Sequence, residues 1–341
     1  MRPLLHPTLV NGRFGDPALY LETLFETRAL LFDLGDISAL SPRKLQRLEH
    51  VFVSHTHIDH FVGFDRLLRI LVGREKKIAL YGPKGFIEHV HHKLQAYRWN
   101  LVDGYLCDLV FVVTEFDSSH ESQTARFCLK NAFAIEPIGG GRMSDGVIYN
   151  DPAFRVSTSI LDHRTPCHAF LVEETVHINV WKTRLAELGL TIGPWLRELK
   201  RAVVENRPDD YPIRVDSQSG MSDTREAPLG NLRSVLTVTP GQKIAYVTDA
   251  ADTPANRRAI IGLAQNADLL FIEAAFAKAD ADLAAKRAHL TTAAAGSIAR
   301  EAAVRRVEPF HFSPRYAGQE ERMLNEVMAA FAGQSCTGGA S

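Results

Sequence analysis

The sequence predicts an α/β protein in which two β-sheets pack against each other and helices lie outside them. Three observations lead to this prediction. The chain has 341 residues, enough for one large domain or two of ordinary size. Segments with strand character occur in both halves of the chain, and segments with helical character concentrate near the end of each half. Because each sheet must cover its apolar faces, this distribution favours two packed sheets flanked by helices.

The amino-acid composition indicates an ordinary globular protein and disfavours several other classes of protein. Apolar residues make up 45% of the chain and charged residues 23%, as in ordinary globular proteins. The net charge is −1, so the chain has no overall positive charge that would indicate nucleic-acid binding. No apolar run approaches the ~18 residues of a membrane span, and the N-terminal residues lack the apolar core of a signal peptide. Four cysteines without a C-x-x-C pair, Cys107, Cys128, Cys167 and Cys336, fit a reducing compartment. We therefore expect a cytoplasmic protein with no membrane association.

Apolar runs bounded by turn residues predict the strands of the first half. These runs cover residues 18–25, 28–35, 50–54, 77–82, 109–116, 125–138, 154–162 and 168–174. Two helices are expected among them. Residues 61–72 place their apolar side chains on one helical face, and residues 84–99 form the second helix. The glycine-rich segment 139–146 is expected to be a hairpin loop.

The rest of the chain has two parts of different character. Residues 176–230 contain two expected helices, 181–189 and 193–206, and then the polar stretch 207–230, which reads as a loop or linker. The last third alternates more regularly. Its expected strands are 243–250, 267–274 and 305–312, and its expected helices are 254–265, 291–304 and 313–333. Residues 334–341 are expected to be a frayed tail.

The chemistry is concentrated in the segment Ser-His-Thr-His-Ile-Asp-His at residues 54–60. His55, His57, Asp59 and His60 are four metal-capable side chains within six residues, between an apolar strand and an amphipathic helix. On a helix, His55 and His57 would point about 200° apart, and on a strand His60 would leave the face that the other three share. A turning loop instead lets all four surround two adjacent ions.

Further ligands are expected at the ends of later strands. His163 follows the strand 154–162, Asp249 ends the strand 243–250, and His311 ends the strand 305–312. Histidine nitrogen and carboxylate oxygen are zinc ligands, and a catalytic zinc site keeps one position open for water. Manganese(II) or iron(II) also suits this donor set. Behind the 54–60 segment, the three residues complete a pattern typical of a dinuclear hydrolase.

Several segments resemble the metallo-β-lactamase fold superfamily and, within it, the ribonuclease Z family. The similar metal motifs are SHTHIDH (54–60), LDHRTP (161–166), YVTDA (246–250) and HFSPRY (311–316). FIEAAF (271–276) is similar to the family's H-E-A-T loop and retains Glu273, with Ile272 in place of its histidine. HLT (289–291) is similar to the H-S-T loop and retains His289. The resemblance extends from residue 33 to residue 316 and so covers nearly the whole chain.

The resemblance implies a four-layer αββα sandwich with a dinuclear metal site at one edge of the two sheets. Residues 1–341 would form a single metallo-β-lactamase-fold domain, with αβ halves at 1–175 and 231–333 and a helical or loop insertion at 176–230. The implied metals are two zinc ions. One would be held by His55, His57 and His163, the other by Asp59, His60 and His311, with Asp249 bridging them.

The implied activity is that of a metal-dependent phosphodiesterase or endoribonuclease, which hydrolyses the 3′ end of precursor tRNA with a metal-bound hydroxide. Asp59 would help to position the hydroxide, and His289, oriented by Glu273, would protonate the leaving 3′-oxygen. The family also suggests a homodimer. The basic residues Lys182, Arg184, Arg197, Lys200 and Arg201 form either an RNA-contact surface or a solvated helix face, since acidic residues interrupt them.

Two alternatives remain open. The family's P-x-K-x-R-N-like RNA-contact loop is not matched by VNGRFGDPALYL (10–21), and its Gly/Pro-rich tRNA-clamping arm is not evident. A small-molecule hydrolase of the same fold, acting on an ester, thioester or lactone, is therefore an alternative. A non-catalytic binding or scaffold protein is the other, and it is disfavoured because seven buried ligands are costly to keep without a metal.

Overall fold

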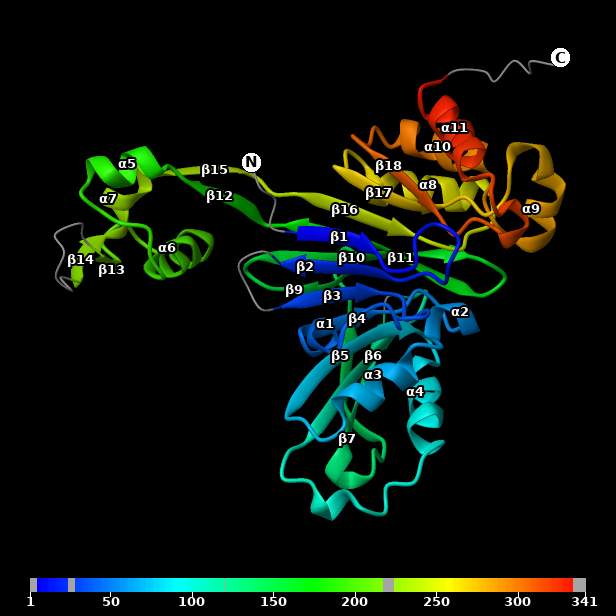
Figure 1. Ribbon diagram of the computed structural model, residues 1–341, viewed down its shortest axis with the longest axis horizontal. Helices are drawn as coiled ribbons and strands as arrows, with labels where there is room; N and C mark the ends of the chain where they lie inside the picture. The colour runs from blue at the N-terminus through cyan, green and yellow to red at the C-terminus, as the bar shows by residue number, and fades with distance from the viewer. Residues whose placement is uncertain (1–4, 24–27, 120, 217–223, 334–341) are drawn as a thin grey trace. The chain divides into compact units, whose positions relative to one another are not determined.

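The computed structural model describes residues 5–23, 28–119, 121–216 and 224–333 (Figure 1). The expected frayed tail, 334–341, lies outside these residues. The chain folds into two compact units. The larger contains residues 5–148 and 157–171 and the chain from residue 243 onward; the smaller contains residues 149–156 and 172–242. The segment 176–230, expected as an insertion, lies within the smaller unit.

The first sheet of the larger unit has eight strands in chain order, β1 to β8. They are β1 (Leu5–Leu9), β2 (Leu19–Thr23), β3 (Ala29–Phe32), β4 (Leu48–Phe52), β5 (Lys76–Pro83), β6 (Leu109–Phe116), β7 (Glu121–Cys128) and β8 (Glu136–Arg142). Strands β3 to β6 run parallel, whereas the outer pairs are antiparallel. The parallel strands are joined through the helices α1 (Pro42–Gln46), α2 (Ile58–Phe61), α3 (Phe64–Leu71) and α4 (Phe86–Gln95).

The second sheet has the strand order β18-β17-β16-β11-β10-β9. Its members are β9 (Val147–Asn150), β10 (Phe154–Asp162), β11 (Pro166–Glu174), β16 (Lys243–Val247), β17 (Leu269–Glu273) and β18 (Val307–Phe310). Strands β16, β17 and β18 are parallel. The helices that accompany them are α8 (Pro254–Ala264), α9 (Ala281–Arg287), α10 (Thr292–Glu301) and α11 (Glu320–Phe331).

Aromatic side chains fill the space between the two sheets. The ring of Phe32 on β3 lies 5.5 Å from that of Phe170 on β11 and 5.8 Å from that of Tyr246 on β16. Phe52 on β4 also meets Phe170, at 5.7 Å. Rings at these separations contribute packing beyond their buried area. The layers are therefore helix, sheet, sheet and helix, which confirms the predicted αββα sandwich.

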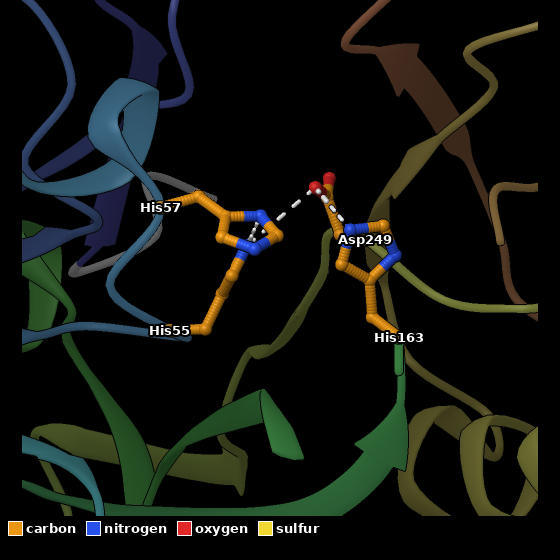
Figure 2. A group of neighbouring side chains, drawn as sticks. All are labelled: His55, His57, His163 and Asp249. Atoms are coloured by element: carbon orange, nitrogen blue, oxygen red, sulfur yellow. Dashed lines mark hydrogen bonds and ion pairs between the residues drawn. The ribbon is translucent and has the colours of Figure 1, made fainter. Parts of the chain in front are cut away.

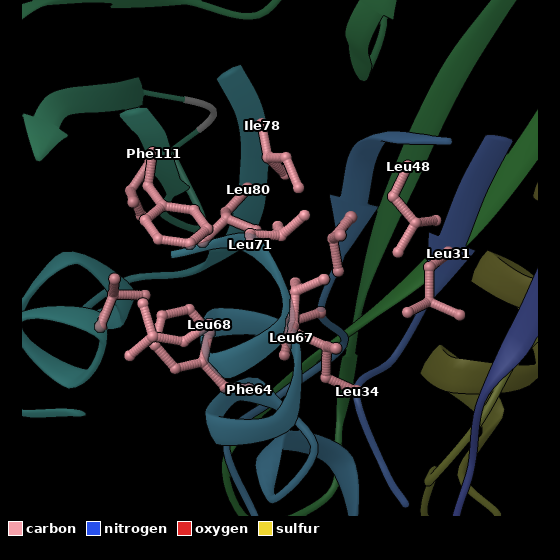
Figure 3. Packing of buried hydrophobic residues seen from close by; sticks show 14 of the residues in the cluster. Leu31, Leu34, Leu48, Phe64, Leu67, Leu68, Leu71, Ile78, Leu80 and Phe111 are labelled. Atoms are coloured by element: carbon pink, nitrogen blue, oxygen red, sulfur yellow. The ribbon is translucent and has the colours of Figure 1, made fainter. Parts of the chain in front are cut away.

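Each sheet buries its other face under helices. Helix α3 points Phe64, Leu67, Leu68 and Leu71 at the first sheet, where they meet side chains such as Phe111 (Figure 3). The apolar period in residues 61–72 predicted this face. Burying one such side chain contributes about 1.5–3 kcal/mol before the entropy of ordering is subtracted. The second sheet has an equivalent layer, formed with α8, α10 and α11.

Two predicted segments of the first half differ from the structure. The strand expected at 125–138 is two strands, β7 and β8, separated by a 3-10 turn at Leu129–Asn131. Ala132 and Phe133 take left-handed φ values of 50° and 54° that reverse the chain, which their residue types do not indicate. The loop expected at 139–146 is also wrong in part, because residues 139–142 continue β8 through backbone pairing with β7.

The smaller unit has an apolar core of its own. It is built on the antiparallel pair β12 (Val176–Val180) and β15 (Leu236–Pro240), with helices α5 (Lys182–Glu187), α6 (Trp195–Val204) and α7 (Leu229–Arg233). The core includes Leu185, Trp195 and Leu199. The polar stretch 207–230, expected as a loop, instead contains a hairpin of β13 (Pro212–Asp216) and β14 (Thr224–Pro228). The apolar pattern of β13 is short, because Ile213 and Val215 are its two buried residues.

Gly63 is a position where the fold permits no side chain. A Cβ on this residue would collide with the carbonyl oxygen of Gly35 and lie 3.1 Å from that of Leu34. Gly63→Ala should therefore lower the free energy of unfolding by about 1–3 kcal/mol, as overpacking does, and displace the nearby metal-ligand loop. Denaturant unfolding measures the loss.

Gly262→Ala is the matched control, because that Cβ on α8 meets nothing within 4 Å. Alanine in a helix interior should raise the free energy of unfolding by about 0.5–1 kcal/mol relative to glycine. Equal stability changes in the two variants would contradict the packing argument.

Candidate metal centre

The seven expected ligands are brought together where strands of both sheets end. The segment 54–60 follows β4, His163 follows β10, Asp249 lies two residues beyond β16, and His311 directly follows β18. Because β16 and β18 run in the same direction, their carboxyl ends deliver Asp249 and His311 to one edge. His311 takes a left-handed φ of 57°, an unusual conformation that turns the chain at the site.

Asp249 is the central acceptor of the cluster. Its Oδ2 lies 3.7 Å from Nε2 of His55, 3.5 Å from Nε2 of His60 and 3.4 Å from Nε2 of His163, and its Oδ1 lies 2.8 Å from Nδ1 of His311. In Figure 2, His55 and His57 face Asp249 and His163 across a small gap. The carboxylate is buried, at 2% exposure. The Asp249 carboxylate therefore contacts, through both of its oxygens, four histidines that come from three different segments of the chain.

The donor atoms gather into three groups, each compact enough for one ion. His55, His57, His163 and Asp249 form the first group, Asp59, His60 and His311 form the second, and Asp249, Glu273, His289 and His311 form the third. Nε2 of His60 and Nε2 of His311 each lie 3.4 Å from Oδ2 of Asp59. The first two groups contain the residues that the resemblance assigns to the two metals, and that assignment stays a prediction. Glu273 and His289 also come within ligand distance of Asp249 and His311.

The donor set fits divalent cations. Nε2 of His55 and Nδ1 of His57 lie 2.8 Å apart, so two imidazole nitrogens face a common position. Among the described residues, Nε2 of His60 and Nδ1 of His311 are buried without an aligned hydrogen bond, although Nδ1 of His311 lies 2.8 Å from Oδ1 of Asp249. Buried polar atoms without partners are costly, and a shared cation would satisfy them together. The cluster is therefore suited to hold a divalent metal, whichever metal it is.

Residues other than the seven expected ligands orient the ligand rings. Nδ1 of His60 contacts the buried carboxylate of Asp33 at 2.9 Å, and Nδ1 of His163 contacts the carbonyl oxygen of Ala288 at 2.7 Å. Nδ1 of His55 lies 3.1 Å from Oγ of Ser54. Hydrogen bonds at Nδ1 leave Nε2 to face the centre, and this fixes which nitrogen can bind a metal.

Asp33 is a functional residue that the sequence reasoning missed. Its carboxylate accepts hydrogen bonds from the backbone N–H of Ser54 (2.6 Å), the Ser54 hydroxyl (2.9 Å) and the Tyr246 hydroxyl (2.9 Å), besides its contact with His60. It follows strand β3 with a φ of 58°. A single signal could have found it: an aspartate at the end of an apolar strand, the same signal that identified Asp249.

Charge and burial set the protonation of the ligands. Burial, followed by the neighbouring His60, lowers the pKa of His55 to about 2, so this ring is neutral and able to bind a metal. Burial opposes protonation of His60 and His311, but the neighbouring carboxylates together outweigh it, Asp249 with Asp33 at His60 and Asp249 with Asp59 at His311. They raise the pKa of both rings, that of His311 to about 10. Burial likewise opposes ionisation of Asp59, yet its contacts with His311 and His60 lower its pKa overall. Metal binding should therefore release protons.

The buried Glu273 and the partly buried His289 form an acid–histidine pair beside Asp249. Nδ1 of His289 lies 3.0 Å from Oε2 of Glu273, whose Oε1 accepts the backbone N–H groups of Ala250 and Leu290. Burial lowers the pKa of His289, but the Glu273 carboxylate outweighs this effect and raises the pKa overall. The ring can therefore carry a proton near neutral pH. Thr291, not His289, caps α10 by accepting the N–H of Ala294.

The cluster of metal-ligand side chains lines one wall of a cavity of about 720 Å³. The N-terminal segment that lacks the family's basic motif still reaches it, because Phe14, Gly15 and Asp16 line the wall. Arg13, in contrast, pairs with Glu308 at 2.7 Å. This segment therefore contributes an aromatic ring and a carboxylate to the cavity.

The five basic residues noted in the sequence lie on two helices of the smaller unit, Lys182 and Arg184 on α5 and Arg197, Lys200 and Arg201 on α6. They are not equivalent. Arg201 lies 3.9 Å from a carboxylate oxygen of Glu205, and burial lowers the pKa of Lys200. The Arg184 guanidinium lies 5.3 Å from the ring of Trp181, a tryptophan that is 48% exposed.

His168 makes the stability of the fold depend on pH. Its Nδ1 contacts Oγ1 of Thr158 at 3.1 Å, and burial lowers its pKa to about 4. Because the unfolded chain would bind this proton near pH 6.5, the free energy of unfolding should fall as pH drops from 6.5 to 4, by up to about 3 kcal/mol. Urea unfolding of the chelator-treated protein across this range measures the slope.

His168→Phe should remove that part of the slope, because phenylalanine cannot take up the proton. His92→Gln, at an exposed position on α4, is the matched control and should keep the slope of the original chain. A slope unchanged in His168→Phe would contradict the assignment.

No helix among the described residues is long and apolar enough to cross a membrane. The two helices with the most residues, α11 and α8, have 12 and 11 residues. A membrane-spanning helix needs about 20.

Comparison with known proteins places these features in context. The family model described as a beta-lactamase superfamily domain matches residues 26–126. The ribonuclease Z of Deinococcus radiodurans is 31% identical over 311 residues, which cover 89% of this chain and 88% of that protein. The ribonuclease Z of a Synechocystis strain is 31% identical over 312 residues, covering 88% and 80%.

Solved structures agree at the level of the fold. The short form of human tRNase Z is similar with a TM-score of 0.54 at 19% identity, over 92% of this chain and 93% of that chain. A metallo-beta-lactamase fold protein from Bacillus subtilis is similar with a TM-score of 0.54 at 15% identity, over 96% and 95%. Both likenesses support the αββα architecture.

Proposed function

Because this chain belongs to the ribonuclease Z family, we propose that it is a metal-dependent endoribonuclease that hydrolyses the 3′ end of precursor tRNA. The observation that carries the proposal is the convergence of seven ligands on the Asp249 carboxylate, with the Glu273–His289 pair alongside. Family membership rests on 31% identity over most of both chains.

We propose that His55, His57 and His163 hold one zinc ion, that Asp59, His60 and His311 hold a second, and that Asp249 contacts both. Manganese(II) or iron(II) would suit the same ligands. When bound, such ions supply water activation and neutralise charge on a phosphodiester. The hydrogen bonds of Asp33 and Ala288 support this assignment, since they hold the rings of His60 and His163 with Nε2 toward the centre.

Three side chains of the protein would serve the reaction itself. Asp59 lines the cavity and has a lowered pKa, so an ionised carboxylate is available to accept a hydrogen bond from the attacking water and orient it. His289, protonated through its contact with Glu273, would donate a proton to the leaving 3′-oxygen. Glu273 would act through His289 as a positioning residue.

Further proposals concern the setting of the enzyme. Cationic and aromatic groups suited to RNA phosphates and bases lie on the smaller unit, namely Lys182, Arg184 and the exposed Trp181.

From the family resemblance we also propose a homodimer, which light scattering can test. A cytoplasmic location fits the cysteines among the described residues, Cys107, Cys128 and Cys167, which are free thiols.

A small-molecule ester, thioester or lactone hydrolase is the second candidate. The observation that favours it is the cavity wall formed by Phe14 and Asp16, where a carboxylate and an aromatic ring stand in place of basic side chains. A carboxylate would repel a phosphate, whereas it would not oppose a neutral ester.

The test is cleavage of precursor tRNA bearing a 3′ trailer by the purified protein, with metal analysis of the same sample. We expect cleavage at the trailer junction that leaves a 3′-hydroxyl, and faster turnover of RNA than of a panel of esters, thioesters and lactones. Asp249→Ala protein controls for contaminating nuclease. Turnover of an ester or lactone without RNA cleavage would contradict the proposal and favour the alternative.

A further inference from the structure

Three arginines, Arg164, Arg287 and Arg315, line the cavity. Arg315 lies over the ring of Phe276, 5.9 Å from its centre, whereas Arg164 and Arg287 are carried by the segments that hold His163 and His289. Arg164 follows the ligand His163 directly, and Arg287 ends α9 two residues before His289. Both side chains are exposed, and neither forms an ion pair with a carboxylate in the part of the chain that the structure describes. Cationic groups left without a counter-ion in a substrate cavity are available to an anionic ligand.

The two arginines are carried by segments bonded to each other. Nδ1 of His163 contacts the carbonyl oxygen of Ala288 at 2.7 Å, and the Arg164 guanidinium donates to the carbonyl oxygen of Lys286 at 2.8 Å. The backbone N–H of Arg164 donates to Oδ1 of Asp162 at 2.7 Å. Arg164 takes a left-handed φ of 60°, which these bonds hold in place. The Arg164 guanidinium therefore lies next to the residue that precedes Arg287.

The cavity wall from the N-terminal segment has the opposite character. Asp16 brings a carboxylate, one oxygen of which accepts the backbone N–H of Asp36 at 3.2 Å. Phe14 packs edge-on against Phe312 with ring centres 5.4 Å apart. An anionic part of a substrate would be repelled there and attracted to the arginine side, which is also the side of the proposed proton donor.

We propose that Arg164 and Arg287 form a subsite for a second, non-scissile phosphate of the substrate. This inference rests on the proposed function, in which His289 protonates the leaving 3′-oxygen. Arg164 directly follows His163, whose ring lies 4.7 Å from that of His289, and Arg287 lies two residues before His289. The phosphate that they bind would therefore be the one directly 5′ of the nucleotide that carries that oxygen. Guanidinium groups bind phosphate oxygens through paired, charge-assisted hydrogen bonds, which would fix the RNA backbone on the leaving-group side.

The test neutralises each partner in turn. On the RNA side, the one phosphate expected to bind the arginines is replaced by an uncharged methylphosphonate, placed at a 2′-deoxy residue. The reference RNA has the same 2′-deoxy residue with an ordinary, charged phosphate. The protein partner is Arg287→Ala. We expect each change alone to lower kcat/KM about tenfold or more, chiefly through KM, and the two together to cost little beyond either one. Arg164→Ala should behave in the same way, and Arg287→Lys should recover part of the loss.

Two controls separate this subsite from general effects. Arg258→Ala, at an exposed arginine on α8 outside the cavity lining, should leave RNA cleavage unchanged. Bis(p-nitrophenyl) phosphate has no second phosphate, so Arg287→Ala should hydrolyse it at the rate of the original chain. The inference would be overturned if the reductions in kcat/KM multiplied when Arg287→Ala acts on the modified RNA. It would also be overturned if Arg287→Ala lost as much activity on bis(p-nitrophenyl) phosphate as on RNA. Either result would leave the proposed function intact. Absence of RNA cleavage by the original chain would overturn both.

Discussion

Replacing Asp249 with alanine should remove both metal ions and lower RNA cleavage by more than about 10³-fold. The buried carboxylate lies 2.8–3.7 Å from ring nitrogens of four histidines, His55 and His163 from one ligand group and His60 and His311 from the other. Its loss therefore removes an oxygen ligand from both groups. The original chain should retain about two metal ions, and a chelator should abolish its activity. Elemental analysis of the two purified proteins measures the difference.

Asp59→Asn is the matched comparison, because the ion pairs of Asp59 with described residues are those with His60 and His311, both in one ligand group. Metal content should fall less in this variant than in Asp249→Ala. Melting temperatures of the metal-free proteins check that both variants fold. Two metals per chain in Asp249→Ala would contradict a bridging role, and an active original chain without metal would contradict the whole mechanism.

Replacing His289 with alanine should leave both metals in place but lower kcat on RNA by about 10²–10⁴-fold, the usual range for loss of a general acid. The ring lies outside the seven ligands and is held by Glu273 at 3.0 Å, which raises its pKa. Only the protonated ring can donate, so the original chain should lose activity as pH rises through this raised pKa. His289→Ala should lack that alkaline limb. Metal content and the pH dependence of kcat are the measurements.

The leaving group distinguishes proton donation from a structural role. p-Nitrophenolate barely needs a proton, so the loss in His289→Ala should be much smaller on bis(p-nitrophenyl) phosphate than on RNA. Helix capping is an unsuitable explanation, because Thr291 itself accepts the N–H of Ala294. Equal losses on both substrates would count against the proton donor. A lowered melting temperature with normal specific activity would point to a purely structural residue.

Local sequence determined most of the elements and the chemistry of the site. The period of apolar residues in 61–72 predicted the buried face of α3, and the density of metal-capable side chains in 54–60 predicted a ligand loop. These features depend on neighbouring residues alone, so a single sequence carries them. Even His163, Asp249 and His311 could be nominated, since each follows a recognisable strand.

Tertiary structure decided what depends on residues far apart in the chain. That the Asp249 carboxylate reaches histidines of both groups follows from how the sheets pair, and no local pattern encodes a distance between residues 55 and 249. The orientation of His60 by Asp33, 27 residues earlier, was equally hidden, as was the reversal of the chain at Ala132 and Phe133. Hydrogen bonds and backbone turns of this kind are specified by packing across the whole fold, which overrides local preference.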